Sequence, residues 1–171
     1  MKFLVISDVH GRYERISELL KMHRDADALM FLGDGLCDLE RAGVHDSGIT
    51  VFSVKGNCDW NSFLRTERIE NELVLNFEGY RFLLMHGHTR SVKSGLTNAI
   101  YAAMERDADI LLFGHTHEPI EKYIPSDSDY ALKKPLRIFN PGSLGASGDG
   151  WGYFGLVEIR GKDVLMSHGK I

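Results

Sequence analysis

Five short apolar segments of this chain each end at a small cluster of polar side chains beside a glycine. The segments and the clusters that follow them are 2–7 with 8–11, 28–32 with 33–34, 50–54 with 56–59, 80–85 with 86–88, and 110–113 with 114–117. Continuous apolar runs are typical of strands that are covered on both faces in a largely parallel sheet. Open α/β sheets bind ligands beyond the carboxyl ends of their strands, so we expect the five clusters to converge on one crevice.

The remaining segments predict helices, hairpins and loops. Helical apolar stripes occur between the first two strands and before the strand at 110–113, at Ile16, Leu19, Leu20 and His23, and at Leu96, Ile100, Ala103 and Met104. Residues 72–85 and 152–167 have the pattern of β-hairpins, which makes the sheets mixed. A further apolar strand is expected at 136–139, and the polar stretch 126–134 is typical of a surface loop.

Composition narrows the classes of protein that this chain represents. With 171 residues, 43% of them hydrophobic, we expect a single domain over 1–171. The net charge of −4 and the lack of a Lys/Arg-rich block argue against a protein that binds duplex nucleic acid. The first apolar run is too short for a signal peptide and no later run reaches membrane-spanning length, so we expect a cytoplasmic protein with no membrane partner.

The polar clusters have the composition of a metal site. They pool two carboxylates, one carboxamide and up to five imidazoles, a set that suits Mn, Fe, Zn, Ni or Co better than Ca or Mg. Cys37 and Cys58 are too few for a four-thiolate zinc site. The number of ligands fits two ions that share a bridging carboxylate. In an extended turn, residues two apart project the same way, so the pairs Asp8/His10 and His115/His117 are each expected to aim two ligands into one cavity.

Taken in order, these motifs resemble those of the calcineurin-like metallophosphoesterase superfamily. They are Asp8-x-His10, Gly33-Asp34-x-x-x-Asp38, Gly56-Asn57, His86-x-His88 and Gly114-His115-Thr116-His117, and they span nearly the whole chain. The short length, the sequence 56–59 (Gly-Asn-Cys-Asp) and the sequence 140–143 (Asn-Pro-Gly-Ser) are similar to the small microbial phosphodiesterase branch. That branch also contains the retromer scaffold subunit of eukaryotes.

The resemblance implies a fold, a ligand set and a reaction. The fold is a four-layer α/β/β/α sandwich of two mixed β-sheets flanked by helices. Two divalent ions are implied, with Mn as the first candidate and Ni, Zn, Fe or Co as alternatives. Asp34 would bridge the ions, and the other ligands would be Asp8, His10 and His117 for the first ion and Asn57, His86 and His115 for the second. The implied reaction is hydrolysis of a small phosphate ester by in-line attack of a metal-bridging hydroxide.

One position departs from most of the superfamily, where a histidine follows the motif asparagine and assists the leaving group. Here that position is Cys58, and a thiol donates a proton poorly near neutral pH. We therefore expect a phosphodiesterase, with Asp34, Asn57, Cys58 and His88 as the residues around the reacting phosphate. A phosphomonoesterase or nucleotidase, and a non-catalytic protein-interaction scaffold on the same fold, remain the alternatives.

Other polar residues near the motifs each have a structural and a functional interpretation. His88 either contacts the substrate phosphate or bonds its own loop. Arg12, Arg90 and Lys93 either attract phosphate or are solvated surface charges, and the second role is favoured. Asp38 and Asp59 are expected to orient the metal ligands or bond loop amides. The sequence 140–143 is expected to make a tight turn, His23 to pack, and edge strands of the terminal hairpin to be available for pairing between subunits.

Overall fold

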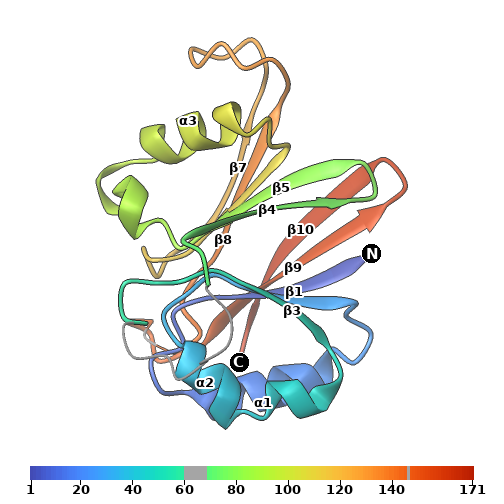
Figure 1. Cartoon of the computed structure of the whole chain (residues 1–171), viewed down its shortest axis with the longest axis vertical. Helices are drawn as coiled ribbons and strands as arrows, with labels where there is room; N and C mark the ends of the chain where they lie inside the picture. The colour runs from blue at the N-terminus through green and yellow to red at the C-terminus, as the bar shows by residue number, and fades with distance from the viewer. Residues whose placement is uncertain (60–68, 146) are drawn as a thin grey trace.

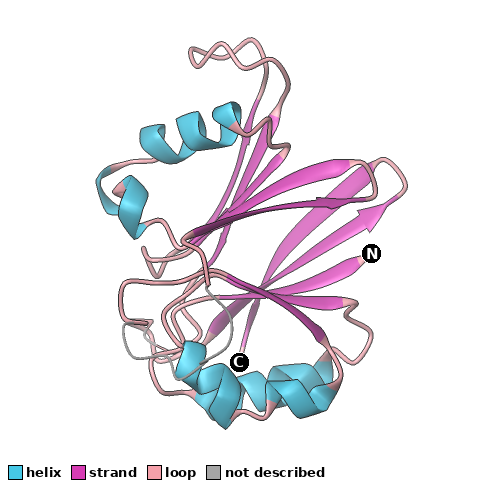
Figure 2. Cartoon of the chain, viewed as in Figure 1, coloured by secondary structure: helices cyan, strands magenta, loops and turns pink. Residues whose placement is uncertain are grey.

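Two five-stranded sheets face each other, and helices cover their outer faces (Figures 1 and 2). The computed structural model describes residues 1–59, 69–145 and 147–171. In Figure 1, α1 and α2 lie below the lower sheet and α3 lies above the upper one. The predicted four-layer α/β/β/α sandwich of mixed sheets is confirmed.

The first sheet has the strand order β10-β9-β1-β2-β3. Its strands are β1 (Lys2–Ile6), β2 (Ala28–Phe31), β3 (Thr50–Ser53), β9 (Tyr153–Arg160) and β10 (Asp163–Lys170). The three strands from the N-terminal segment are parallel, whereas the C-terminal hairpin returns to pair β9 antiparallel with β1. The parallel strands therefore present their carboxyl ends at one edge.

The second sheet has the strand order β4-β5-β6-β8-β7. Its strands are β4 (Glu72–Phe77), β5 (Tyr80–Met85), β6 (Ile110–Phe113), β7 (Pro119–Ile124) and β8 (Leu136–Pro141). Strands β5, β6 and β8 are parallel, and the two edge strands run antiparallel to their neighbours. Each sheet thus contains three neighbouring parallel strands, and polar loops follow these strands.

Helices fill the connections between the parallel strands. They are α1 (Tyr13–Met22), α2 (Leu36–Arg41) and α3 (Thr97–Glu105), with short 3-10 turns at η1 (Val44–Ser47), η2 (His88–Arg90) and η3 (Val92–Ser94). His23 ends α1 and its ring packs on Phe154 at 5.2 Å between centroids, as the packing role predicts. None of the helices in the described part of the chain is long and apolar enough to cross a membrane.

The apolar runs of the central strands are buried on both faces. In β1, Phe3 and Val5 enter the core between the sheets, while Leu4 and Ile6 pack with the helices on the outer face. Strand β6 alternates in the same way between the inter-sheet core and the layer under α3. Each such side chain contributes about 1.5–3 kcal/mol through burial, so both faces of these strands hold the layers together.

Three of the differences from the sequence prediction have a clear physical reason. Strand β7 was not expected, because it is an edge strand in which four of six side chains are exposed, and it therefore lacks a clear apolar face. Helix α2 was not expected either, since its six residues are too few to show a helical period. Strand β10 extends to Lys170, three residues beyond the predicted hairpin, because its end pairs with β9 as far as Tyr153.

Candidate metal centre

The loops after five of the parallel strands bring their polar side chains together at one rim of the sandwich. Two groups of three side chains result, each with its ligand atoms within 4.8 Å of one another: Asp8, His10 and His117, and Asp34, His86 and His115. Each group combines residues that follow strands of the first sheet with residues that follow strands of the second sheet. The predicted convergence of the strand ends is therefore observed.

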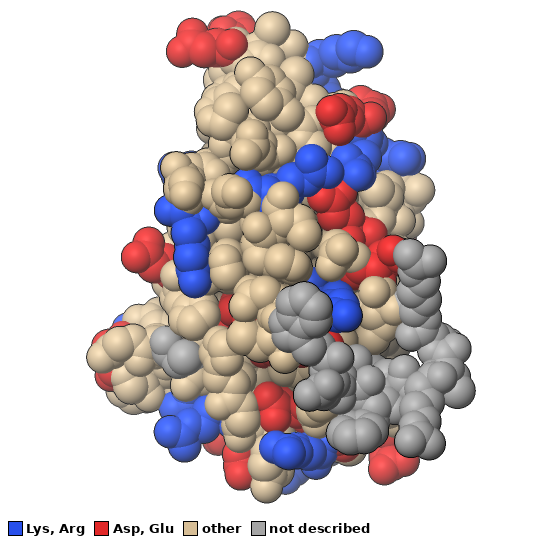
Figure 3. Space-filling view, turned by 60° about the vertical axis from the view of Figure 1, so that its left-hand side comes forward, with Lys and Arg blue, Asp and Glu red and all other residues tan. Residues whose placement is uncertain are grey.

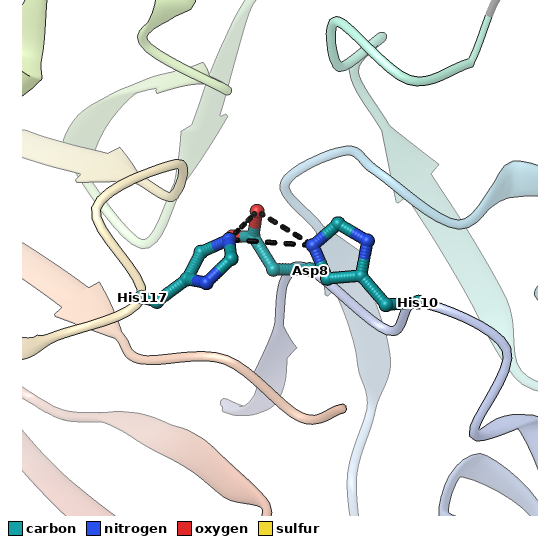
Figure 4. Close-up of side chains that lie close together, drawn as sticks. All are labelled: Asp8, His10 and His117. Atoms are coloured by element: carbon teal, nitrogen blue, oxygen red, sulfur yellow. Dashed lines mark hydrogen bonds and ion pairs between the residues drawn. The ribbon is translucent and has the colours of Figure 1, made fainter. Parts of the chain in front are cut away.

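The first group surrounds one oxygen of Asp8 (Figure 4). His117 Nε2 lies 3.1 Å from Asp8 Oδ1, and His10 Nε2 lies 3.8 Å from the same oxygen and 3.3 Å from His117 Nε2. The other oxygen, Oδ2, accepts hydrogen bonds from Ser7 Oγ at 2.6 Å and from the backbone amide of His115 at 2.9 Å. Asp8 Oδ1 is buried without a hydrogen-bond partner among the described residues.

The second group is arranged around His86, whose tautomer is fixed by the backbone. His86 Nδ1 donates to the carbonyl of Leu32 at 2.7 Å, so Nε2 of the neutral ring carries a lone pair. Nε2 lies 3.1 Å from Asn57 Oδ1, 3.1 Å from His115 Nδ1 and 3.4 Å from Asp34 Oδ2. The rim therefore gathers lone pairs of oxygen and nitrogen around one point.

Such an arrangement fits divalent cations. A buried carboxylate oxygen without a partner is costly, and converging lone pairs repel one another unless a cation lies between them. The donors are carboxylate, carboxamide and imidazole, a set that suits the borderline transition metals. The Asp8 and Asp34 groups are close neighbours, since Asp8 Oδ1 lies 3.9 Å from His86 Nε2. The bridging role of Asp34 stays a prediction.

The carboxylates and imidazoles of the two groups shift one another's pKa values. Burial opposes the charge on Asp34, but the hydrogen bonds from His86 and from the Cys58 amide lower its pKa well below the usual value. The pKa of Asp8 is also lowered. Burial raises it, but this effect is outweighed chiefly by the interaction of the carboxylate with His117. Burial and the charge of His86 lower the pKa of His115 to about 4. Both carboxylates and His115 are therefore in the unprotonated forms that bind metals. Burial opposes the charge on His86, but Asp34 and Asp8 raise its pKa, so an ion bound there would replace the proton on Nε2.

Five of the candidate ligands have left-handed backbones. The φ angles are 54° at Asp8, 47° at His10, 59° at Asp34, 69° at His115 and 65° at His117. The expected extended turns are therefore wrong, because the left-handed residues turn the chain sharply at the strand ends. His115 and His117 enter different groups, whereas Asp8 and His10 share one. Left-handed non-glycine residues persist only where surrounding contacts hold them.

Two glycines allow the loops to approach each other closely. A Cβ atom at Gly56 would lie 2.1 Å from Asp34 Oδ1, and one at Gly114 would lie 2.0 Å from Ser7 Oγ. A larger residue at either position would displace a carboxylate or its support. These glycines are thus required by the packing of loops from neighbouring strands.

Asp59 and Asp38 hold loop amides, as the sequence predicts. Asp59 accepts hydrogen bonds from the backbone amides of Asp34, Gly35, Leu36 and Gly56, at 2.8–3.0 Å. It therefore joins the loop that carries Asp34 to the loop that carries Asn57. Asp38 Oδ2 accepts from the amide of Gly11 at 2.9 Å, and so holds the loop that follows β1.

Cys58 and His88 lie at the edge of the site. The backbone amide of Cys58 donates to Asp34 Oδ1 at 2.7 Å, and its sulfur accepts from Asn57 Nδ2 at 3.2 Å. Burial and Asp34 raise the pKa of the Cys58 thiol to about 11, so it stays protonated near neutral pH. The ring of His88 lies 5.4 Å from that of His86, and burial followed by the charge of His86 lowers its pKa.

The comparisons with known proteins agree with this geometry. Residues 1–162 match the model of the calcineurin-like phosphoesterase superfamily domain. The chain belongs to the calcineurin-like phosphoesterase superfamily. It is 32% identical over 145 residues to a probable metallophosphoesterase, YsnB of Bacillus subtilis, which covers 84% of this chain and 75% of the relative.

Solved structures share the fold of this chain. An archaeal protein described as a novel phosphodiesterase superposes with a TM-score of 0.72 at 18% identity, covering 98% of this chain and 99% of its own. Vps29 of Entamoeba histolytica, solved with Zn²⁺, gives a TM-score of 0.71 at 21% identity and covers 99% of both chains. At these identities the likeness establishes the fold, and the family match establishes a metal-dependent phosphoesterase.

Sequence reasoning missed how Asn140 and Ser143 support this phosphoesterase site. Buried Asn140 donates through Nδ2 to the carbonyl of Gly114 and to Thr116 Oγ1, both at 3.0 Å, and accepts from the Gly142 amide at 2.8 Å. Ser143 Oγ donates to the carbonyl of Asp8 at 2.8 Å. The 140–143 segment therefore holds the left-handed ligand loops as well as turning the chain. A buried amide directly after an apolar strand was the available signal.

Asn140→Ala is expected to weaken binding of both ions by about tenfold, the lower end of the usual effect of a residue that supports metal ligands. The reason is that His115 and His117 belong to different groups, yet share the turn that Asn140 holds. Calorimetric titration of metal-free protein with Mn²⁺ measures the change, and excess Mn²⁺ should restore turnover. Asn76→Ala, at an exposed position of β4, is the matched control, and unchanged affinity in Asn140→Ala would contradict the positioning role.

The basic residues near the motifs have different surroundings. Arg90 Nε donates to Glu72 Oε1 at 2.6 Å, so its charge is already paired. Lys93 is exposed and lies close enough to His115 for its charge to contribute to the lowered pKa of that ring. Arg12 is exposed beside the first motif. The surface role that the sequence favours for Arg12 and Lys93 fits their exposure.

Proposed function

We propose that the chain is a dinuclear, metal-dependent phosphodiesterase that hydrolyses a small phosphodiester, with Mn²⁺ as its preferred ion. The observation that carries the proposal is the placement of His86, whose Nδ1 is held by the Leu32 carbonyl and whose Nε2 therefore faces Asn57 Oδ1, His115 Nδ1 and Asp34 Oδ2. A centre with two carboxylates is positive when two divalent ions occupy it, and it then attracts an anionic phosphate.

The chain's own residues prepare the site before substrate enters. Two ions held by the seven candidate ligands would supply positive charge for the phosphoryl oxygens and would lower the pKa of a coordinated water. Leu32 holds His86 in one tautomer, and Asn57 donates to Cys58 so that its own oxygen turns toward His86. Asp59 fixes the loops of Asp34 and Asn57 relative to each other. The ligands are therefore held in place without rearrangement, as electrostatic stabilisation of a transition state requires.

The leaving-group side of the site determines which class of leaving group departs readily. Cys58 stands where a proton donor is expected, and its pKa of about 11 makes it a weak acid. Acidic leaving groups depart without such help, whereas alkoxide leaving groups of monoesters and diesters alike depend on it. The chemistry therefore favours an ester with an acidic leaving group, and we propose a diester because the motifs resemble those of the phosphodiesterase branch.

A metal add-back assay tests the proposal against the scaffold alternative. Chelated protein is mixed separately with Mn²⁺, Ni²⁺, Co²⁺, Zn²⁺, Fe²⁺ and Mg²⁺, and turnover of bis(p-nitrophenyl) phosphate is compared with that of p-nitrophenyl phosphate. We expect Mn²⁺ to restore the highest rate and the diester to be cleaved faster than the monoester. Absence of turnover with every metal, in protein shown to bind two ions per chain, would favour the scaffold.

A further inference from the structure

A cavity of about 400 Å³ opens beside the metal centre. Its wall comprises Lys55, Gly56, Asn57, Ile69, Glu70, Asn71 and His88. Asn57 belongs both to this wall and to the candidate ligand set, so the cavity adjoins the point at which a phosphate would bind. The volume falls within the range of about 300–1,000 Å³ that is typical of small-molecule sites. We refer to it as the side cavity.

The wall of the side cavity is polar and of mixed charge. Lys55 and Glu70 contribute opposite charges, Asn71 contributes an exposed amide, and Ile69 contributes an apolar surface. His88 brings an imidazole whose Nδ1 has no hydrogen-bond partner among the described residues. Figure 3 shows Lys and Arg interspersed with Asp and Glu on the face that it draws, without an extended field of one sign. Such a wall suits a group with both donors and acceptors better than a polyanion or a purely apolar group.

We propose that the side cavity binds the ester substituent that stays on phosphorus during the reaction, and that it selects a polar substituent of nucleoside size. The inference rests on the proposed phosphodiesterase function, because a monoester has no second substituent to place. In-line displacement sends the leaving group away from the attacking oxygen, so the retained substituent must lie to the side of that axis. The side cavity lies alongside the candidate ligands and has the size for this group.

Lys55 and Asn71 are the specificity-determining residues of this proposal. Lys55 lies two residues beyond the end of β3, and its backbone amide donates to the carbonyl of Glu70 at 2.9 Å, which joins the two segments of the wall. Neither Lys55 nor Asn71 belongs to the candidate ligand set. Their side chains can therefore be changed without removing a metal ligand.

Three diesters with one leaving group provide the test. Methyl, phenyl and thymidine-5′ p-nitrophenyl phosphates release the same p-nitrophenolate and differ in the retained substituent. With Mn²⁺-loaded protein, we expect kcat/KM for the thymidine ester to exceed that for the methyl ester by about tenfold, roughly the effect of one hydrogen bond on affinity. The phenyl ester should resemble the methyl ester. Equal rates for the phenyl and thymidine esters would overturn selection of a polar group.

Variants of the wall link this preference to the side cavity. Asn71→Ala and Lys55→Met should each reduce the preference for the thymidine ester, mainly through KM, and leave turnover of the methyl ester near that of the wild type. Asn76→Ala and Lys133→Met, at exposed positions away from the wall, are the matched controls. An unchanged preference in both wall variants would overturn the assignment.

Binding to the metal-free protein separates this inference from the proposed function. Thymidine is titrated into ¹⁵N-labelled protein, and the side-chain amide signal of Asn71 is followed by NMR. A shift of that signal, absent in a titration with ribose alone, supports the side cavity whether or not any diester is cleaved. No shift at millimolar thymidine, together with equal kcat/KM for all three esters, overturns it, whereas lack of turnover alone counts against the phosphodiesterase function.

Discussion

Replacement of Asp34 by asparagine is expected to remove both metal ions and to lower kcat/KM for an activated diester by about a thousandfold, because the ions contribute several kcal/mol to the transition state. Asparagine keeps the size of the side chain and an oxygen that accepts the Cys58 amide, now 2.7 Å from Asp34 Oδ1. It lacks the negative charge that reduces repulsion between two cations. The fold should therefore persist while the ions are lost.

Elemental analysis of metal per chain is the decisive measurement for Asp34→Asn, with circular dichroism as the check on folding. Asp127→Asn changes an exposed carboxylate in the loop after β7 and should leave both metal content and activity unaltered. If Asp34→Asn retained two ions per chain, the bridging assignment would be wrong. Loss of one ion alone would place Asp34 on a single ion.

The second prediction concerns Cys58→His. Cys58 is exposed, so a larger ring has room at this position. An imidazole there is a far better acid near neutral pH than a thiol of pKa about 11, and positioned acid catalysis contributes about a hundredfold. We expect the gain to be greatest for alkyl leaving groups and small for p-nitrophenolate, which departs without a proton.

The measurement is the dependence of rate on leaving-group pKa for the wild type, Cys58→His and Cys58→Ala. The wild type and Cys58→Ala should share a steep slope, and Cys58→His should have a shallower one. Metal content must be equal in all three proteins, since Asn57 donates to the Cys58 sulfur and a change there could disturb a ligand. Equal slopes in all three would show that position 58 does not face the leaving group, and a large loss in Cys58→Ala alone would give the thiol a direct role.

Much of the fold was predictable because burial on two faces leaves a clear pattern in sequence. Strands β5 and β6 were predicted with the bounds that the structure shows, since they are continuous apolar runs at the centre of a sheet. Strand β7 could not be predicted in the same way, because an edge strand exposes most of its side chains. The exposed part of a sheet is specified by backbone pairing, which composition does not reveal.

The sequence also predicted which side chains gather at the site, but not every contact that holds them there. Parallel strands end at a common edge, so the convergence of Asp8, Asp34 and His115 followed from the strand pattern. The division of the ligands into two groups came from the family resemblance and not from the strand pattern, because it depends on how the two sheets face each other. The support given by Asn140 was also hidden, since its hydrogen bonds join segments 24–26 residues apart in sequence.

Each group of candidate ligands spans both halves of the sandwich, since Asp8, His10 and Asp34 follow strands of one sheet and the clustered histidines 86, 115 and 117 follow strands of the other. Ions bound there would cross-link the two sheets at the rim, whereas the apolar core between the sheets holds them together in the interior. An ion that binds only the closed arrangement adds about 2.7 kcal/mol against opening when its concentration is a hundred times Kd. Metal binding is therefore expected to stabilise the association of the two sheets, and removal of the ions by a chelator is expected to weaken it first at this rim.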